Sequence, residues 1–198
     1  MNDLEKSILA LSRAHDKFRI QGEFTRGDEV KNKWPNGLAC SKELEYFFNN
    51  YDPRNVKIET GFTPIKFFSM DVLEKAQYGY KWIKSSTSVS VNPSWPDDYV
   101  VFMDDVGGGK PIIAVTTHLG TSIYANYDVG VPFKIADSLS DYLFSLAKLI
   151  EIVYGEFNIF DIADDNGLNN AFVKRLKEDI EPVIGVDNFN GFLDYFYG

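Results

Sequence analysis

The chain has 198 residues, of which 44% are hydrophobic and 15% aromatic, enough for a hydrophobic core and too many for a disordered chain. Its formal net charge of −9 is uneven: residues 1–99 carry 14 basic and 14 acidic side chains, and residues 100–198 carry 6 and 15. The acidic excess argues against nucleic-acid binding through phosphates, and no apolar run is long enough to cross a bilayer.

The N-terminus and the cysteine content both indicate a compartment. The segment MNDLEKSILALSRAHDK has charges scattered among its apolar positions, whereas a secretory signal has a basic start and an uninterrupted apolar block. The single cysteine, Cys40, cannot form an internal disulfide, which agrees with a reducing compartment. We therefore expect a cytoplasmic protein with no membrane partner.

The first part of the chain is expected to be helical with a long loop. Apolar spacing predicts an amphipathic helix over residues 3–19, and the polar, glycine- and proline-containing residues 20–37 predict a loop. Ser41 is the expected N-cap of a second helix, which ends near Asn49-Asn50 because Asp52-Pro53 prevents its continuation.

Residues 56–93 are expected to contain short strands, a short helix and a loop. One or two strands are expected between Val56 and Phe68, where apolar residues roughly alternate around a break at Gly61. Ser69 is the expected cap of a short helix over Met70–Tyr78. The polar residues Ser85–Pro93 predict a loop that ends in an extended segment.

The stretch Tyr99–Thr117 predicts the centre of the sheet. Val100–Phe102 and Ile112–Val115 are apolar and rich in β-branched residues, and Asp104–Gly109 forms an acidic, glycine-rich turn between them. A further strand over residues 122–126 would complete an antiparallel meander. We expect the glycines to provide the positive φ angles of the turn.

The last third is expected to be mainly helical. Apolar residues at helical spacing predict a helix over residues 135–154, with Asp137 or Ser138 as its N-cap. A second helix is expected over Leu168–Glu181, with its end marked by Pro182, and a short closing helix or strand over Phe189–Tyr197.

The usual catalytic groups do not form a recognisable motif. Cys40, His15 and His118 lie in unrelated contexts, and no nucleophile-elbow sequence accompanies them. The triple glycine before Lys110 is not a Walker loop, and the aspartates that precede it would repel a phosphate.

Metal binding is the enzymatic alternative that the residues leave open. Asp104 and Asp105, and separately Asp161, Asp164 and Asp165, could offer oxygen ligands to a divalent metal. However, the second group lacks the EF-hand spacing, no CxxC or HExxH is present, and adjacent aspartates usually stabilise turns. We therefore expect no metal, no cofactor and no catalytic residue.

The order of these features resembles the SUKH superfamily, which includes fungal Smi/Knr cell-wall regulators and many bacterial immunity proteins. The parts that carry the resemblance follow one another from about residue 40 to residue 152: the helix Ser41–Asn50, Trp95 with the strand Val100–Phe102, the turn Asp104–Gly109, the strand Pro111–Val115, and the helix that begins Ile135-Ala136-Asp137-Ser138-Leu139. The chain departs from the family pattern in having no proline at the start of the first of these helices and in its long tail after Gly155.

The resemblance implies an α+β fold, with a curved antiparallel sheet and helices packed on one side and at the N- and C-termini. It implies a single SUKH-like domain over residues 1–198, with a core at about 40–155, an N-terminal helix over 3–19 and a C-terminal helical extension over 156–198.

The resemblance also implies an immunity protein, not an enzyme, that binds and neutralises a cognate polymorphic or contact-dependent toxin such as a nuclease. An acidic inhibitor would complement the basic surface of a nuclease. The expected partner-binding residues are Asp104, Asp105, Trp95, Tyr124, Tyr127, Asp161, Asp164 and Asp165. A regulatory or scaffold protein of the same fold, and a small metal-dependent hydrolase that uses Asp104 and Asp105, remain as alternatives.

Overall fold

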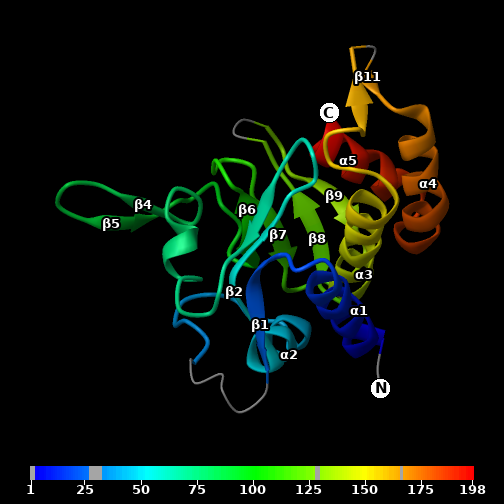
Figure 1. Ribbon diagram of the computed structural model, residues 1–198. Helices are drawn as coiled ribbons and strands as arrows, with labels where there is room; N and C mark the ends of the chain where they lie inside the picture. The colour runs from blue at the N-terminus through cyan, green and yellow to red at the C-terminus, as the bar shows by residue number, and fades with distance from the viewer. Residues whose placement is uncertain (1–2, 27–32, 128–129, 166) are drawn as a thin grey trace.

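The computed structural model describes residues 3–26, 33–127, 130–165 and 167–198, without the side chains of Arg26 and Asp164 (Figure 1). Its helices are α1 (Asp3–Lys17), α2 (Lys42–Asn50), the 3-10 turn η2 (Lys75–Gln77), α3 (Leu139–Ile150), the π-helical turn η3 (Glu151–Glu156), α4 (Asn170–Ile184) and α5 (Val186–Tyr197). Its strands are β1 (Gln21–Arg26), β2 (Tyr51–Ile58), β3 (Ile65–Phe67), β4 (Trp82–Lys84), β5 (Val89–Val91), β6 (Tyr99–Asp105), β7 (Ile112–Val115), β8 (Ser122–Ala125), β9 (Phe133–Ala136), β10 (Ala163–Asp164) and β11 (Gly167–Leu168).

The fold is α+β, as the sequence predicts, and is built on one seven-stranded antiparallel sheet. Its strand order is β1-β2-β3-β6-β7-β8-β9, so each strand pairs with the next along the chain except where residues 68–98 intervene. That excursion carries η2 and the β4–β5 hairpin, which projects from one side of the molecule in Figure 1. The sheet does not close, and all neighbouring strands except β3 and β6 follow one another directly in the order of strands along the chain.

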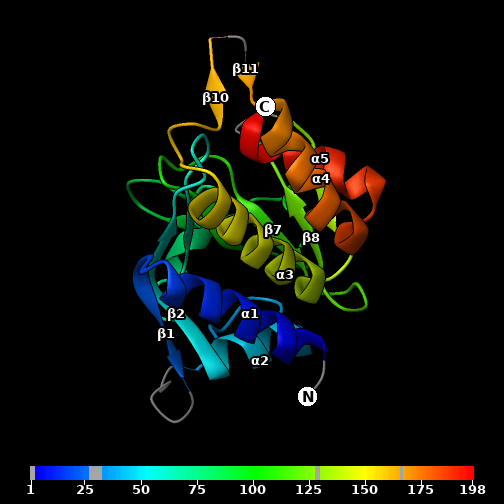
Figure 2. The same cartoon turned by 45° about the vertical axis from the view of Figure 1, so that its right-hand side comes forward.

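The main helices cover one face of the sheet. Helix α1 packs along α3, α3 packs on α4, and α5 packs on β9, which places the four helices on the same side in Figures 1 and 2. The hydrophobic core lies between this layer and the sheet, and runs from Leu4 of α1 to Tyr197 of α5. Phe102 of β6 lies within this core, where its ring contacts Phe67 on β3 and Tyr142 on α3.

The central hairpin predicted over Tyr99–Thr117 is formed by β6 and β7. The two strands pair from Tyr99 opposite Val115 to Met103 opposite Ile112, with a β-bulge between Val101 and Met103. Because the bulge adds one residue, Phe102 and Met103 both enter the helix-facing core instead of alternating between faces.

Two N-caps are confirmed, but the start of the long helix was wrong. Ser41 Oγ accepts the Leu44 N–H at 3.1 Å, and Ser138 Oγ accepts the Asp141 N–H at 3.0 Å. The predicted helix over residues 135–154 instead begins at Leu139, because residues 133–136 form β9 and pair with β8. Apolar residues just before a helix can belong to the helix or to a preceding strand, and here they belong to the strand β9.

One segment predicted as a loop contains a strand: residues 20–37 include β1, which pairs along β2. Ser85–Pro93 ends in the extended segment that the sequence predicts, which is β5 and pairs with β4. Strand β1 has no apolar alternation, so its pairing partner and not its own residues determines its conformation. The expected strands between Val56 and Phe68 are β2 and β3, with β2 beginning at Tyr51.

The predicted helix over Met70–Tyr78 is wrong: the segment consists of turns and the 3-10 element η2, whose last residue is Gln77. Strand β3 ends opposite Met103, which leaves the Val101 backbone of β6 without a strand partner on that side. The buried Gln77 amide takes its place: Nε2 donates to the Val101 carbonyl at 2.8 Å, and Oε1 accepts the Val101 N–H at 3.0 Å. The side chain therefore continues the ladder beyond β3.

The C-terminal tail is part of the core. Helix α4 continues past Pro182, the predicted end, to Ile184, so the proline lies in the last turn and lacks the N–H that would donate to the Glu178 carbonyl. In α5, a Cβ on Gly191 would lie 3.1 Å from the Lys134 carbonyl oxygen of β9. This glycine thus permits the close packing of α5 on the last strand.

The other face of the sheet lies beneath residues 68–98 in part. Val101, Ile113 and Val115 are buried there, on the side opposite to the helix-facing Val100 and Ala114. Tyr124 of β8 lies opposite Ile113 and shares this face. Among the described residues, no helix combines the length and the apolar character that a membrane span requires.

Candidate functional site

The acidic turn between β6 and β7 is a network of hydrogen bonds centred on Asp104. Asp104 is only 5% exposed. Its Oδ1 accepts the N–H groups of Asp105 at 2.9 Å and Lys110 at 3.0 Å, and its Oδ2 accepts the Tyr80 hydroxyl at 2.9 Å and the Gly109 N–H at 3.5 Å. Asp104 therefore ties the turn to a residue of the excursion.

Asp105 and the glycines complete the turn. Asp105 accepts the N–H groups of Gly107 and Lys110, each at 3.1 Å. Gly108 and Gly109 have φ angles of 81° and 109°, which L-residues rarely adopt. The glycines thus serve backbone geometry, as predicted, and allow N–H groups to converge on the two carboxylates.

Burial controls the protonation of this network. It raises the pKa of Asp104, and the hydrogen-bonded, neighbouring Asp105 carboxyl raises it further. Burial also raises the pKa of Tyr80, and the charge of Asp104 adds to this shift. Tyr80 therefore keeps its proton at neutral pH, and its hydroxyl donates a hydrogen bond to Asp104.

A hollow of about 590 Å³ opens above this turn on the face of the sheet opposite the main helices. We call it the aromatic hollow. Its lining comes from the excursion, the β6–β7 turn and the segment after β8: Phe68, Lys75, Ala76, Tyr78, Gly79, Tyr80, Asn92, Trp95, Asp104, Gly108, Gly109, Asn126 and Tyr127.

An aromatic row extends from this hollow across the sheet. The Tyr80 and Trp95 ring centroids are 5.4 Å apart, those of Trp95 and Tyr99 5.8 Å, those of Tyr99 and Tyr124 6.2 Å, and those of Tyr124 and His118 6.3 Å. Trp95, Tyr99 and Tyr124 are half-buried, so they combine fixed positions with accessible apolar surface.

Tyr127 forms the opposite wall of the hollow. Its hydroxyl donates to Asp194 of α5 at 2.7 Å, and its ring contacts Phe133 at 5.4 Å between centroids. The Lys110 ammonium lies 5.5 Å from the Tyr127 ring centroid, and the Lys110 carbonyl accepts the Tyr195 hydroxyl at 2.6 Å. Helix α5 therefore positions this side of the hollow.

Most of the residues expected at the site lie together. Trp95, Asp104 and Tyr127 line the hollow, Asp105 adjoins Asp104, and Tyr124 is connected through the aromatic row. The sequence missed Tyr80 and the other lining residues of 75–80, because their contact with a turn 24 residues later leaves no local pattern. Asp104 faces inward, so its carboxylate holds the turn.

The remaining acidic residues lie elsewhere. Asp161 and Asp165 are exposed beside the β10–β11 hairpin, which projects past α5 in Figure 2 and contributes no residue to the hollow. The side chain of Asp164 lies outside the described part of the chain. The expected contact residues therefore divide between the aromatic hollow and this hairpin.

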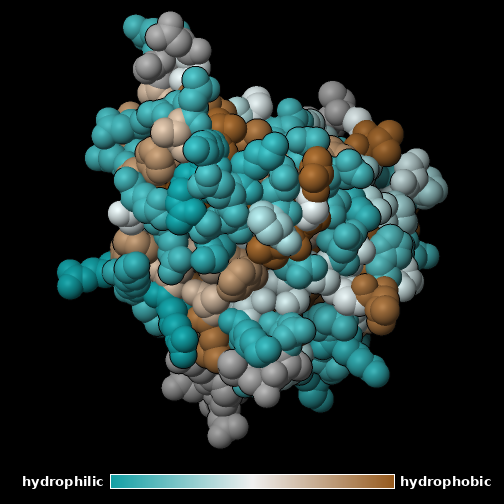
Figure 3. Space-filling view, turned by 90° about the vertical axis from the view of Figure 1, so that its right-hand side faces the viewer, coloured by the Kyte–Doolittle hydropathy of each residue, from teal (hydrophilic) through white to brown (hydrophobic). Residues whose placement is uncertain are grey.

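The acidic side chains on the outer helices are largely paired. Glu156 accepts from Arg175 Nε at 2.7 Å, and Asp179 pairs with both Arg175 and, at 3.8 Å, Lys148. Hydrophilic side chains cover most of this face (Figure 3). Paired charges and polar side chains thus characterise the helical side, in contrast to the rings that line the aromatic hollow.

The groups most suited to nucleophilic or metal chemistry are not assembled. Partial desolvation and the Glu45 carboxylate raise the pKa of Cys40 to about 11, so its thiol stays protonated at neutral pH. His15 of α1 is buried against Phe24 of β1, and His118 adjoins Tyr124. Within residues 3–26, 33–127, 130–165 and 167–198, no three His, Cys, Asp or Glu residues are grouped to hold a metal ion.

Comparisons with protein-family models, with curated proteins and with solved structures gave no match to this chain.

Proposed function

We propose that this chain is a protein-binding immunity protein of the SUKH type, which neutralises a cognate toxin in the cytoplasm without a cofactor. The observation that carries the proposal is the aromatic hollow with its row of half-buried rings. Aromatic side chains held in a concave site are the residues that dominate protein–protein binding energy. Tyr127 and Trp95, on separate walls, would be its main anchors.

The charge of the chain supports a basic partner. The net charge is −9, and all of the excess lies in residues 100–198. A long-range field of this sign would speed encounter with a nuclease toxin, whose own substrate requires a basic face. The same excess disfavours nucleic acid as the ligand of the hollow.

The structural role of Asp104 gives the hydrolase alternative less support. A metal-bridging carboxylate needs free lone pairs, whereas both oxygens of Asp104 already accept hydrogen bonds from the turn and from Tyr80. The regulatory or scaffold alternative would use the same hollow and differs only in its partner.

The test is co-expression with the toxin encoded beside this gene, followed by a binding measurement. We expect the chain to restore growth, and Trp95→Ala to weaken binding by about 30-fold, which corresponds to about 2 kcal/mol for an aromatic anchor. Phe160→Ala is the matched control: Phe160 is 82% exposed and outside the hollow, so its loss should change the Kd by less than about threefold. Growth arrest by every neighbouring candidate, without binding, would contradict the immunity function.

A further inference from the structure

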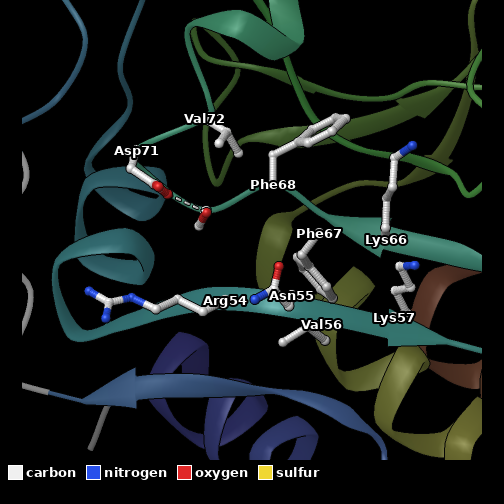
Figure 4. Close-up of a pocket in the computed structure, with 10 residues that line it drawn as sticks. Arg54, Asn55, Val56, Lys57, Lys66, Phe67, Phe68, Asp71 and Val72 are labelled. Carbon is white, nitrogen blue, oxygen red and sulfur yellow. Dashed lines mark hydrogen bonds between the residues drawn. The ribbon is translucent and has the colours of Figure 1, made fainter.

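A second hollow adjoins the first on the far side of Phe68 and differs from it in charge. It also measures about 590 Å³ and lies over β2, β3 and the start of the excursion (Figure 4). We call it the cationic hollow. Its lining consists of Arg54, Asn55, Val56, Lys57, Lys66, Phe67, Phe68, Ser69, Asp71 and Val72.

The lining carries three cations and one carboxylate, a formal charge of +2 in a chain whose net charge is −9. Lys57 of β2 and Lys66 of β3 are direct cross-strand partners and lie side by side in Figure 4, with Arg54 at the other end of the hollow. The acidic member of this lining, Asp71, accepts a hydrogen bond from the Ser69 hydroxyl.

This arrangement costs stability, and the contacts of the two lysines offset that cost on one side only, at Lys66. Like charges placed directly opposite on neighbouring strands destabilise a sheet. Within the described part of the chain Lys57 has no ion pair or hydrogen bond, whereas Lys66 Nζ donates to the Val106 carbonyl at 3.3 Å and lies 5.8 Å from the Phe68 ring centroid. Residues that weaken a local structure with little compensation are characteristic of functional sites.

Arg54 is held at its end of the hollow. Its Nε lies 3.5 Å from Oδ2 of Asp52, a fully buried carboxylate, while 43% of the Arg54 side chain remains exposed. The Asn55 side chain stands between Arg54 and the lysines and projects into the hollow (Figure 4). The three cations, a central amide and the ring of Phe68 thus share one concavity.

We infer that the cationic hollow binds a phosphorylated small molecule, with its phosphate groups between Lys57 and Lys66 and its organic part against Asn55 and Phe68. Lysine ammonium groups are common phosphate ligands, and the volume lies in the range of small-molecule sites. The bounded concavity favours a small ligand over an extended polyanion, which would need a longer basic surface.

The test is calorimetric titration of the full chain with ADP and, separately, with pyrophosphate. We expect ADP to bind with a Kd below about 1 mM, and Lys57→Ala and Lys66→Ala each to weaken binding about tenfold, the loss expected for a charge-assisted hydrogen bond. Lys84→Ala removes an exposed lysine outside this hollow and should change the Kd less than about twofold.

The same variants test folding and specificity. Because each substitution relieves the like-charge pair, Lys57→Ala and Lys66→Ala should unfold at or above the urea midpoint of the parent chain. Pyrophosphate binding equal to that of ADP would place the affinity in the phosphates alone and overturn the role of Phe68 and Asn55. No heat with either compound at 5 mM, an equal loss in Lys84→Ala, or equal binding of polyglutamate would overturn the site. Trp95→Ala should leave ADP binding unchanged, because Trp95 lines the aromatic hollow and not the cationic one. The ADP titration therefore tests the cationic hollow independently of the proposed immunity function.

Discussion

Asp104 is the residue whose structural role can be measured most directly. Asp104→Asn keeps an oxygen for the two backbone N–H groups and offers an N–H to the Tyr80 oxygen, whereas Asp104→Ala leaves these buried groups unpaired. We expect the alanine variant to lose about 2–4 kcal/mol of unfolding free energy and the asparagine variant to lose less than about 1 kcal/mol at pH 7. Urea denaturation of both variants measures the difference.

The pH dependence of the same pair tests the raised pKa of Asp104. Because burial raises the pKa of the folded carboxyl, the folded chain binds a proton more readily than the unfolded chain. The contribution of the protonated Asp104 carboxyl to folding stability is therefore complete below its ordinary pKa of 3.8. It is lost as the pH rises through the higher pKa of the folded state. The parent chain should thus lose unfolding free energy between pH 4 and pH 7 relative to Asp104→Asn, whose amide does not titrate. A difference that stays constant over this range would contradict the raised pKa of Asp104.

At the scale of residues, the sequence indicated the glycine geometry but not the carboxylate network. Gly108 and Gly109 adopt the positive φ angles that their position between two strands predicts. Asp104 looks equally suited to a solvent-exposed turn, and only its contact with Tyr80, 24 residues away, makes it a buried acceptor. A tertiary hydrogen bond of this kind has no periodicity from which it could be read.

At the scale of elements, Gln77 replaces a strand. Its amide pairs with both backbone groups of Val101, so Gln77→Ala leaves a buried N–H and a buried C=O without partners. We expect a loss of about 2–5 kcal/mol in unfolding free energy. Faster hydrogen exchange at the Val101 N–H would locate the effect in β6.

Lys75→Ala is the control for this substitution, because Lys75 also belongs to η2 but its side chain is exposed. Its unfolding free energy should stay within about 0.5 kcal/mol of the parent value. Equal losses in the two variants would indicate that η2 as a whole, and not the Gln77 amide, supports β6.

Local signals account for the elements that were predicted, and pairing accounts for those that were not. The caps at Ser41 and Ser138 depend on residues within one helical turn, so the sequence shows them. Strand β1 acquires its conformation from β2, and residues 133–136 pair with β8, so that α3 begins only after them. For the same reason the sequence predicted Trp95 and Tyr127 singly but not the hollow that they share.

At the scale of the whole molecule, the tail after Gly155 belongs to the structure that forms the hollow. Phe196 of α5 is fully buried and contacts the rings of Phe192 and Tyr195, and Tyr195 in turn holds the Lys110 carbonyl. We expect Phe196→Ala to lose about 3–5 kcal/mol of unfolding free energy through the cavity that it creates. A chain ending at Gly155 should lack cooperative unfolding, because α5 no longer covers β9.

Phe160→Ala is the matched control for Phe196→Ala. It also removes a phenylalanine side chain from the tail, but Phe160 is 82% exposed. Phe160→Ala should stay within about 0.5 kcal/mol of the parent chain in urea denaturation. Should the chain ending at Gly155 unfold cooperatively with a near-parental midpoint, the tail would be an addition to an independent core. The loss of the Tyr127 wall would then affect partner binding without affecting the stability of the sheet, since Tyr127 depends on Asp194 and Tyr195 for its position.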